Sequence, residues 1–413
     1  MPSVSSLKKN KYPLGFYICF IIVLSLLFGS RSFLIGAFTA ITILIFISIN
    51  GKVSRRLQYC LLVIPIIALP VVSIFIKVDS SKGRLLIYKV STEIAKDHYF
   101  HGVGIHNFPN YYCHYQEVYF ERGDFTQSEL LLADSVNFVY NDYFQLFIEL
   151  GLIGIAICLC FLWLVWKTVD TVKSHLHNNL MTITVFNIIT IAVAALFTHV
   201  FDVNYFQLAF GCSLLIFWGF VLGLQKLRHT IIVVGFVVGV TTFHSYDRIL
   251  LHREYSNMKE AKTLFKQEFY GEADSICKLL YPAFNGNEQF LDLYSQALFY
   301  NYKVGQSKRI LKRLIAIRDS YVLQRRLALC YLDERNIREA ENALKRSINM
   351  VPNRFLSRYD LFNLYFDNKQ YALAQTVALA IIKLPVKVPS PIIRKIKQET
   401  SQKLLTLNKL SLR

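Results

Sequence analysis

Two arginines and a glycine turn are the first candidates for chemistry. Arg31 stands alone in the segment FGSRSFLIGAF, between two apolar runs. Arg84 is the second residue of the segment GRLLIYKVSTEIAKD, whose pattern predicts an amphipathic helix that is followed by a turn through Gly102 and Gly104. A guanidinium offers a rigid fork of donors that matches a phosphate, so Arg31 is a candidate anion clamp. A snorkelling arginine at the headgroup level is the plainer interpretation of Arg31, and a phosphate cradle is one use of the glycine turn.

A second group of polar side chains lies where an apolar run begins. In the segment FVYNDYFQLFIELGLIGI, residues 138–155, the spacing of Asn141, Gln145 and Glu149 places them on one face if the segment is already helical. A polar stripe that leads into a membrane helix is costly unless it faces a cavity or partner helices. Farther along the chain, THVFDVNY places His199 and Asp202 in a short loop. A histidine there is either a structural residue or a proton carrier.

The composition indicates a membrane protein with a basic tail. The chain has 413 residues, of which 54% are hydrophobic and only 18% are charged, and its net charge is +18. Most of that charge, +13, belongs to residues 245–413, and residues 1–244 carry +5. A basic domain beside a membrane suits an anionic lipid surface better than nucleic acid. The eight cysteines are scattered, without the spacing of a metal site or a disulfide framework. We therefore predict no metal and no cofactor.

Apolar runs predict about seven membrane-spanning helices, since a span needs about 20 apolar residues. The first run follows three lysines, so a signal peptide is an alternative for it. Clusters of Lys and Arg fall at alternate ends of successive runs, which predicts that those ends are cytoplasmic. The long loop 77–143, the 199–205 loop and the tail are then periplasmic, in a bacterial inner membrane. The runs cover residues 13–29, 32–50, 58–76, 144–166, 180–201, 205–224 and 229–243.

The tail, residues 245–413, has the pattern of paired amphipathic helices. Small residues recur at intervals of 34, 33 and 34 residues, at Ala273, Ser307, Ala340 and Ala374. This period and the Pro352 that closes one unit are typical of tetratricopeptide repeats. The predicted fold class is therefore all-α: a polytopic helical membrane domain over 1–244, and an α-solenoid of about four repeats that binds a peptide or protein. A generic bundle of helical hairpins is the alternative.

These motifs together resemble the O-antigen ligase and polymerase superfamily of bacterial membrane glycan transferases. The resemblance spans about 25–225 and depends on SRSFLIGAF, on the segment that ends GVGIHNFPNYY, on YNDYFQLFIELGLIG, and on the later helices around His199. Some members also carry a tetratricopeptide tail. The resemblance implies that a glycan moves from a polyprenyl diphosphate carrier to lipid A core, another glycan or a protein, on the periplasmic face and without a metal.

The resemblance also implies roles for particular residues. Arg31 and Arg84 would hold the carrier diphosphate, Gly102, Gly104 and Asn107 would shape the loop, and Asn141, Gln145 and Glu149 would frame the helix mouth.

The sequence departs from the family pattern at two points. The loop histidine of the family falls at Tyr140, and a phenol with a pKa near ~10 is a poor base at neutral pH. The base is then His199 or one of the loop histidines, which are His98, His101 and His106. One predicted span precedes the Ser-Arg turn, whereas family members usually have more. These departures keep a different hypothesis open, namely a membrane-anchored scaffold that recruits an envelope protein and carries an inactive transferase domain.

Overall fold

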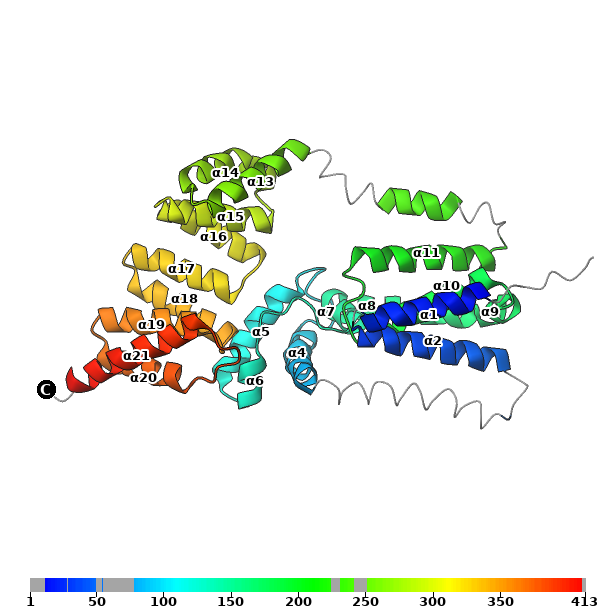
Figure 1. Ribbon diagram of the computed structural model, residues 1–413, viewed down its shortest axis with the longest axis horizontal. Coiled ribbons are helices and arrows are strands. Elements are labelled where there is room, and N and C mark those ends of the chain that lie inside the picture. Colours follow the sequence, from blue (N-terminus) through cyan, green and yellow to red (C-terminus); the bar gives the residue numbers. More distant parts are fainter. Residues whose placement is uncertain are drawn as a thin grey trace, which may run out of the picture. The chain divides into compact units, whose positions relative to one another are not determined.

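The computed structural model describes residues 12–27, 29–49, 54, 78–223, 231–240 and 251–410. Over these residues the chain is helical and forms no strand, which confirms the all-α prediction for the described part. Backbone packing divides the chain into two compact units (Figure 1). The first unit comprises 1–81, 98–104 and 138–246, and the second comprises 82–97, 105–137 and 247–413. Two pieces of the predicted outer loop therefore pack with the tail.

The first unit is a bundle of apolar helices. Its helices are α1 (Tyr12–Leu27), α2 (Arg31–Ile49), α7 (Asp142–Leu150), α8 (Leu152–Lys167), α9 (Val169–His175), α10 (Asn179–Ala194) and α11 (Asn204–Val221). Within the described residues, length and composition suit a span in two of them, at Arg31–Ser48 and Asn204–Val221. Shorter apolar helices occupy Gly15–Leu27, Leu152–Lys167, Asn179–Ala194 and Ile231–Val240. The predicted span 58–76 lies outside the described residues, so the seven-span topology stays a prediction.

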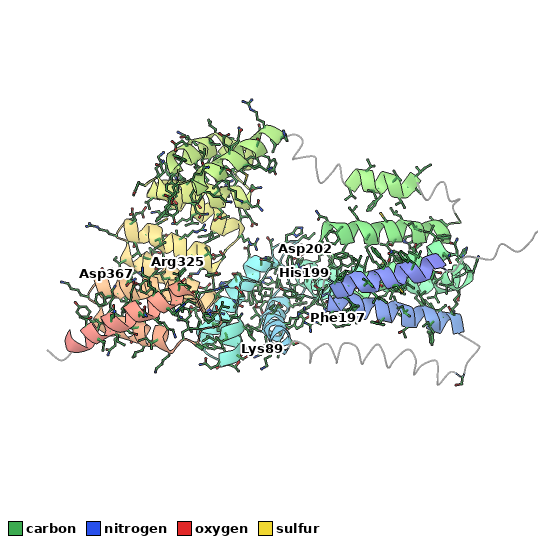
Figure 2. All side chains as sticks on the ribbon, in the orientation of Figure 1. Lys89, Phe197, His199, Asp202, Arg325 and Asp367 are labelled. Carbon is green, nitrogen blue, oxygen red and sulfur yellow. The ribbon has the colours of Figure 1, made fainter. Side chains whose placement is uncertain are left out.

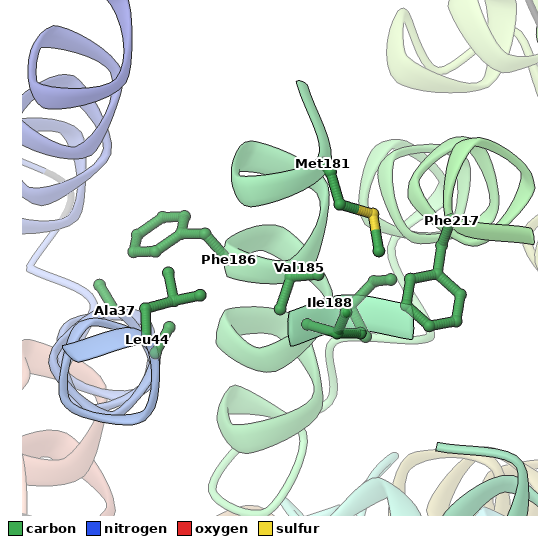
Figure 3. Packing of buried hydrophobic residues seen from close by; sticks show 9 residues of the cluster. Ala37, Leu44, Met181, Val185, Phe186, Ile188 and Phe217 are labelled. Atoms are coloured by element: carbon green, nitrogen blue, oxygen red, sulfur yellow. The ribbon is translucent and has the colours of Figure 1, made fainter. Parts of the chain in front are cut away.

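The core of this bundle lies where α2 and α10 pack together (Figure 3). Small side chains on α2, Ala37 and Ala40, are fully buried there, against Phe186 of α10. Gly36 approaches α10 so closely that a Cβ at this position would lie 2.3 Å from the carbonyl oxygen of Thr190. Small residues at a helix crossing let two backbones approach, which is how helices gain packing energy inside a membrane.

The second unit consists of helices from the predicted outer loop and of the tail. The loop contributes α4 (Val78–Asp97, which belongs to this unit from Lys82 onward), α5 (Phe108–Arg122) and α6 (Gln127–Leu132). The tail helices pack in successive antiparallel pairs, and a last helix covers the end. The tail helices are α13 (His252–Lys266), α14 (Tyr270–Phe284), α15 (Glu288–Tyr300), α16 (Val304–Ile317), α17 (Tyr321–Asp333), α18 (Ile337–Met350), α19 (Phe355–Asp367), α20 (Tyr371–Lys383) and α21 (Pro391–Leu410).

The four helix pairs repeat the same local structure. The four small residues that set the sequence period each occupy the fourth position of the second helix of a pair, and all four are buried. The turn before that helix contains a residue with positive φ in each pair, at Glu268, Tyr302, Arg335 and Lys369. The residue after it donates its N–H to a carbonyl near the end of the first helix, a bond typical of a left-handed helix end. The predicted solenoid of about four repeats is thus a tetratricopeptide-like array.

Candidate functional site

The segment predicted to enter the membrane as one helix is two helices that meet at Gly151. Asn141 does not belong to the polar stripe, because it precedes α7 and its side chain accepts the N–H of Phe144 at 3.0 Å as the N-cap. Gln145 and Glu149 do share a face, where the Gln145 amide donates to Glu149 Oε1 at 3.1 Å. Gly151 has φ +61° and separates α7 from α8. The sequence pattern missed this break because the apolar run continues across it.

The glycine turn caps the carboxyl end of α7. Gly102 donates its N–H to the carbonyl of His98, and the N–H groups of Val103 and Gly104 donate to the carbonyls of Ile148 and Glu149, both at 2.9 Å. These donors are therefore used inside the protein, and the interpretation of the turn as a phosphate cradle is wrong. The glycines serve a close approach of two backbones instead.

We expect Gly102→Ala to lower the stability of the chain by about 3 kcal/mol or more. Gly102 has φ +71°, and a Cβ there would lie 2.3 Å from the carbonyl oxygen of Glu149. The left-handed conformation costs an alanine about 1–2 kcal/mol, and displacing the neighbouring backbone adds a similar amount. The midpoint of thermal unfolding of the full chain in detergent measures the loss.

Gly123 provides the matched control for this variant. Its φ is +82°, but no atom lies within 4 Å of the position that a Cβ would take. Gly123→Ala should therefore lower the stability only by the cost of the left-handed conformation, about 1–2 kcal/mol. Equal losses in the two variants would show that the contact between the glycine turn and α7 contributes nothing.

The two residues predicted to be catalytic, Tyr140 and His199, lie side by side. The His199 ring stacks on Phe138, with centroids 4.4 Å apart and planes 6° apart, and it meets the Tyr140 ring edge-on at 5.4 Å. Tyr140 has φ +60°, a strained conformation for a non-glycine residue, in which histidine and asparagine are found more often. An imidazole is thus present beside the position where the family pattern has its histidine. Figure 2 shows His199 and Asp202 on the connection between α10 and α11.

Asp142, which the sequence analysis did not single out, holds the loop of His199 in place. Its Oδ2 accepts the N–H groups of Val200 at 2.7 Å and of Phe201 at 3.1 Å. Burial raises the pKa of the Asp142 carboxyl to about 6, against the opposite effect of these two hydrogen bonds. Its position in the first turn of α7 is typical of an acidic residue near a helix N-terminus. Because that position is common for an acidic residue, it did not indicate that Asp142 contacts the loop of His199, some sixty residues away.

The raised pKa of Asp142 predicts a pH dependence of stability. A carboxyl with a folded pKa of about 6 and an unfolded pKa near ~3.9 binds its proton more tightly in the folded state. The contribution of this carboxyl to the free energy of unfolding is therefore full below pH ~4 and is lost as the pH rises through about 6. Asp142→Asn should flatten this dependence, since one amide oxygen can accept both N–H groups. Asp142→Ala should unfold at a lower temperature at every pH, because it leaves two backbone donors without an acceptor. If the change in unfolding midpoint between pH 4.5 and 7.5 is the same for wild type and Asp142→Asn, the assignment is contradicted.

Arg31 is the first residue of α2, at the same end of the first unit as the residues above. Two positions along, Phe33 stacks on Phe206 of α11, with centroids 4.4 Å apart. Phe33 and Tyr143 of α7 also pack on one apolar cluster, formed by Ile191, Ala194, Ala195 and Val200. The start of α2, the start of α7 and the loop of His199 therefore surround a common core.

Arg84 and Asn107 belong to the second unit. Arg84 lies on α4, where it counteracts the rise in the pKa of Tyr88 that burial causes. Asn107 lies immediately before α5, and its carbonyl accepts the N–H groups of Asn110 and Tyr111. A donor site that combines Arg31 with Arg84 stays a prediction, since the two residues lie in different units.

Comparison with known proteins agrees with the motifs described above. The family model described as O-antigen ligase matches residues 16–159. This stretch is similar to O-antigen ligase domains. It includes Arg31, Arg84, the glycine turn, Tyr140 and Glu149, whereas His199 lies beyond it. The O-antigen ligase family is a bacterial inner-membrane family, and similarity to it suggests a membrane glycan transferase. No curated protein matches the chain.

Part of the chain is similar to solved structures. Two of them are crystal structures of putative kinesin light chain nearly identical TPR-like repeats from Podosopora anserina, one of which carries a single substitution. They are 16% and 17% identical to this chain over 38% of its length, cover 93% and 94% of their own length, and have a TM-score of 0.30. The tetratricopeptide-like description of the tail depends on its own helix pairs, given above.

Proposed function

We propose that the chain transfers an oligosaccharide from a polyprenyl diphosphate carrier to an acceptor on the periplasmic face of the inner membrane. The observation that carries this proposal is the juxtaposition of Tyr140 and His199, next to the loop contact of Asp142 and to the core that the start of α2 shares. Tyr140, Asp142 and the start of α2 fall within residues 16–159, the stretch that matches the O-antigen ligase model. One end of the first unit thus gathers an imidazole, a phenol, a carboxylate and an arginine.

The reaction needs few protein groups. The acceptor hydroxyl attacks the anomeric carbon, the bond from that carbon to the diphosphate oxygen breaks, and its electron pair stays on the diphosphate. Arg31 and Arg84 hold the diphosphate and neutralise the charge that grows on it. His199 takes the proton of the acceptor hydroxyl, since an imidazole changes its charge near neutral pH. Tyr140 orients that hydroxyl. No metal is required in this scheme.

The charge distribution along the first unit supports a periplasmic site. Helix α8 begins beside the glycine turn and ends at Lys167, and α9 carries Lys173. Helix α10 then begins at Asn179 and returns toward the loop of His199. The lysines therefore lie at the opposite end of these helices from the proposed site, and cationic ends are usually cytoplasmic.

Reporter fusions and a transfer assay test this proposal. Fusions at residues 120 and 300 should be active only outside the cytoplasm, and membranes that contain the chain should transfer glycan from a lipid diphosphate donor. Candidate acceptors are lipid A core, a growing glycan and a protein hydroxyl, each offered separately. Cytoplasmic activity of the fusion at 120 would overturn the topology and the site with it.

The scaffold hypothesis has one observation in its favour. Helices α15, α16 and α17 line a pocket of about 280 Å³ whose wall includes Arg325, Arg326 and Cys330. A side chain of a periplasmic protein partner could fill it. A chain that captures such a partner but transfers no glycan from any donor would favour the scaffold over the enzyme.

A further inference from the structure

The tail uses one edge of its repeats to hold the predicted outer loop. Helix α5 packs against α18 within the second unit. The contacts come from the end of α18 and from the connections that follow α16 and α18. This edge is separate from the pocket between α15 and α17. The partner that the repeats bind here is therefore a segment of the same chain.

Side-chain amides make this contact specific. The amide of Asn110 on α5 donates to the carbonyl of Ile317 and accepts the N–H of Asp319 at 2.9 Å, so it pairs with the tail backbone in both directions. Gln116, which is fully buried on α5, donates to the carbonyl of Met350. The buried amide of Gln116 and the half-buried amide of Asn110 hold one register, because any shift would leave them without these partners.

The loop after α6 is held in the same way. The amide of Asn353 donates to the carbonyls of Leu131 at 3.0 Å and Ala133 at 2.6 Å. Beside it, the Arg354 guanidinium donates to Asp134 Oδ1 at 2.7 Å. Both ends of the loop segment 105–137 therefore contact the tail.

A partly buried arginine of the tail pairs with one carboxylate across the contact and with one carboxylate of the tail itself. Arg346 of α18 donates from Nε to Glu117 Oε1 at 3.0 Å and from Nη2 to Glu117 Oε2 at 3.3 Å. The same Nη2 donates to Asp319 Oδ2 at 3.1 Å. The Glu117 side chain is 8% exposed. A buried carboxylate that loses its partner is strongly destabilised, so the contact depends on Arg346.

The held loop in turn fixes α4, the helix that carries Arg84. Lys89 of α4 pairs with Glu129 of α6 at 2.6 Å, and Arg122 of α5 pairs with Glu93 of α4 at 3.2 Å. A further bond joins α5 to the end of α4, where the Tyr115 hydroxyl donates to the Asp97 carboxylate at 2.7 Å. Figure 2 shows Lys89 on α4. Contacts therefore run without interruption from the third repeat through α5 and α6 to α4.

We infer that the repeat tail is a clamp within the same chain that positions α4, and with it Arg84, for the carrier diphosphate. The role of Arg84 in this inference rests on the proposed function, whereas the contact between the tail and the loop does not depend on that function. Arg346 is then a positioning residue, which acts through Glu117 and never touches the donor. A tetratricopeptide array is thereby part of the transferase rather than a recruiter of another protein at this edge.

The test compares Arg346→Ala with Arg338→Ala in the full chain. Arg338 lies on the same helix and is exposed, which makes it the matched control. Arg346→Ala should raise the rate of trypsin cleavage within residues 82–137 at least tenfold and raise the KM for a lipid diphosphate donor by a similar factor, with a smaller change in kcat. Arg346→Lys should recover part of both effects, and Arg338→Ala should behave as wild type.

Asn110→Ala is a second test variant, which is informative even if Arg346→Ala fails to fold. It removes two hydrogen bonds to the tail backbone without leaving a charge unpaired, and it should also raise cleavage and KM. Wild-type cleavage rates in both Arg346→Ala and Asn110→Ala would overturn the clamp. Faster cleavage with an unchanged donor KM would overturn the positioning of Arg84. If the wild-type chain transfers nothing, the proposed function fails, and the cleavage rates alone support or overturn the clamp.

Discussion

His199→Ala is expected to slow glycan transfer by about 10²- to 10⁴-fold, which is the usual contribution of a positioned general base. The physical reason is that the imidazole, stacked on Phe138, would accept the proton that the acceptor hydroxyl loses. The variant should bind the lipid diphosphate donor as wild type does, so the loss should appear in kcat. Initial rates in membranes, corrected for the amount of chain present, measure it.

Tyr140 supplies a control and a rescue for this variant. Tyr140→Phe should slow glycan transfer far less than His199→Ala does, because the phenol only orients the acceptor hydroxyl. The ring of residue 140 lies 5.4 Å from that of His199, so Tyr140→His in the His199→Ala background should restore part of the rate. Wild-type transfer by His199→Ala would remove the base from this position, and His98, His101 and His106 would be the histidines to test next.

Arg31→Ala and Arg84→Ala are each expected to slow transfer by about one to two decades. A lost charge-assisted hydrogen bond costs about 1.5–3 kcal/mol, and ~1.4 kcal/mol corresponds to a factor of ten. Arg→Lys at either position should also impair transfer, since an ammonium lacks the bidentate fork. The effects should not simply add, because both residues would serve one ligand.

Lys167→Ala is a suitable control for the arginine variants, since it removes a cation at the far end of α8. It should leave the transfer rate unchanged. If both arginine variants transfer at the wild-type rate, the assignment of the diphosphate site is wrong. If Arg31→Ala alone is impaired, the diphosphate is bound by the first unit without Arg84.

Periodic features of the fold could be predicted from the sequence. The small residues of the tail, such as Ala273 and Ala340, pack at the same position of every helix pair, because one packing rule repeats with the sequence. The starts of α2 and α10 followed from apolar runs in the same way. The position of His199 near Tyr140 is consistent with the proposed outer site, which the Lys and Arg pattern placed at one end of the bundle.

Features that depend on contacts between distant residues could not be predicted. The break at Gly151 arises because the glycine turn caps α7. No local sequence pattern indicates that the turn packs there. Asp142 holds a loop that lies 58 residues ahead. The attachment of the outer loop to the tail depends on Asn110 and Arg346, whose partners are over 200 residues away. Polar residues with such partners look like ordinary surface residues in the sequence.

The most direct test of the central claim follows both products of the reaction at once. The purified full chain is placed in vesicles with a labelled polyprenyl diphosphate glycan and an acceptor, and released polyprenyl diphosphate is counted against glycan transferred. We predict one carrier released for each glycan transferred by wild type, and at least a roughly tenfold slower rate for Arg31→Ala. No release by wild type, or equal release by wild type and the Arg31→Ala/Arg84→Ala double variant, would contradict the account.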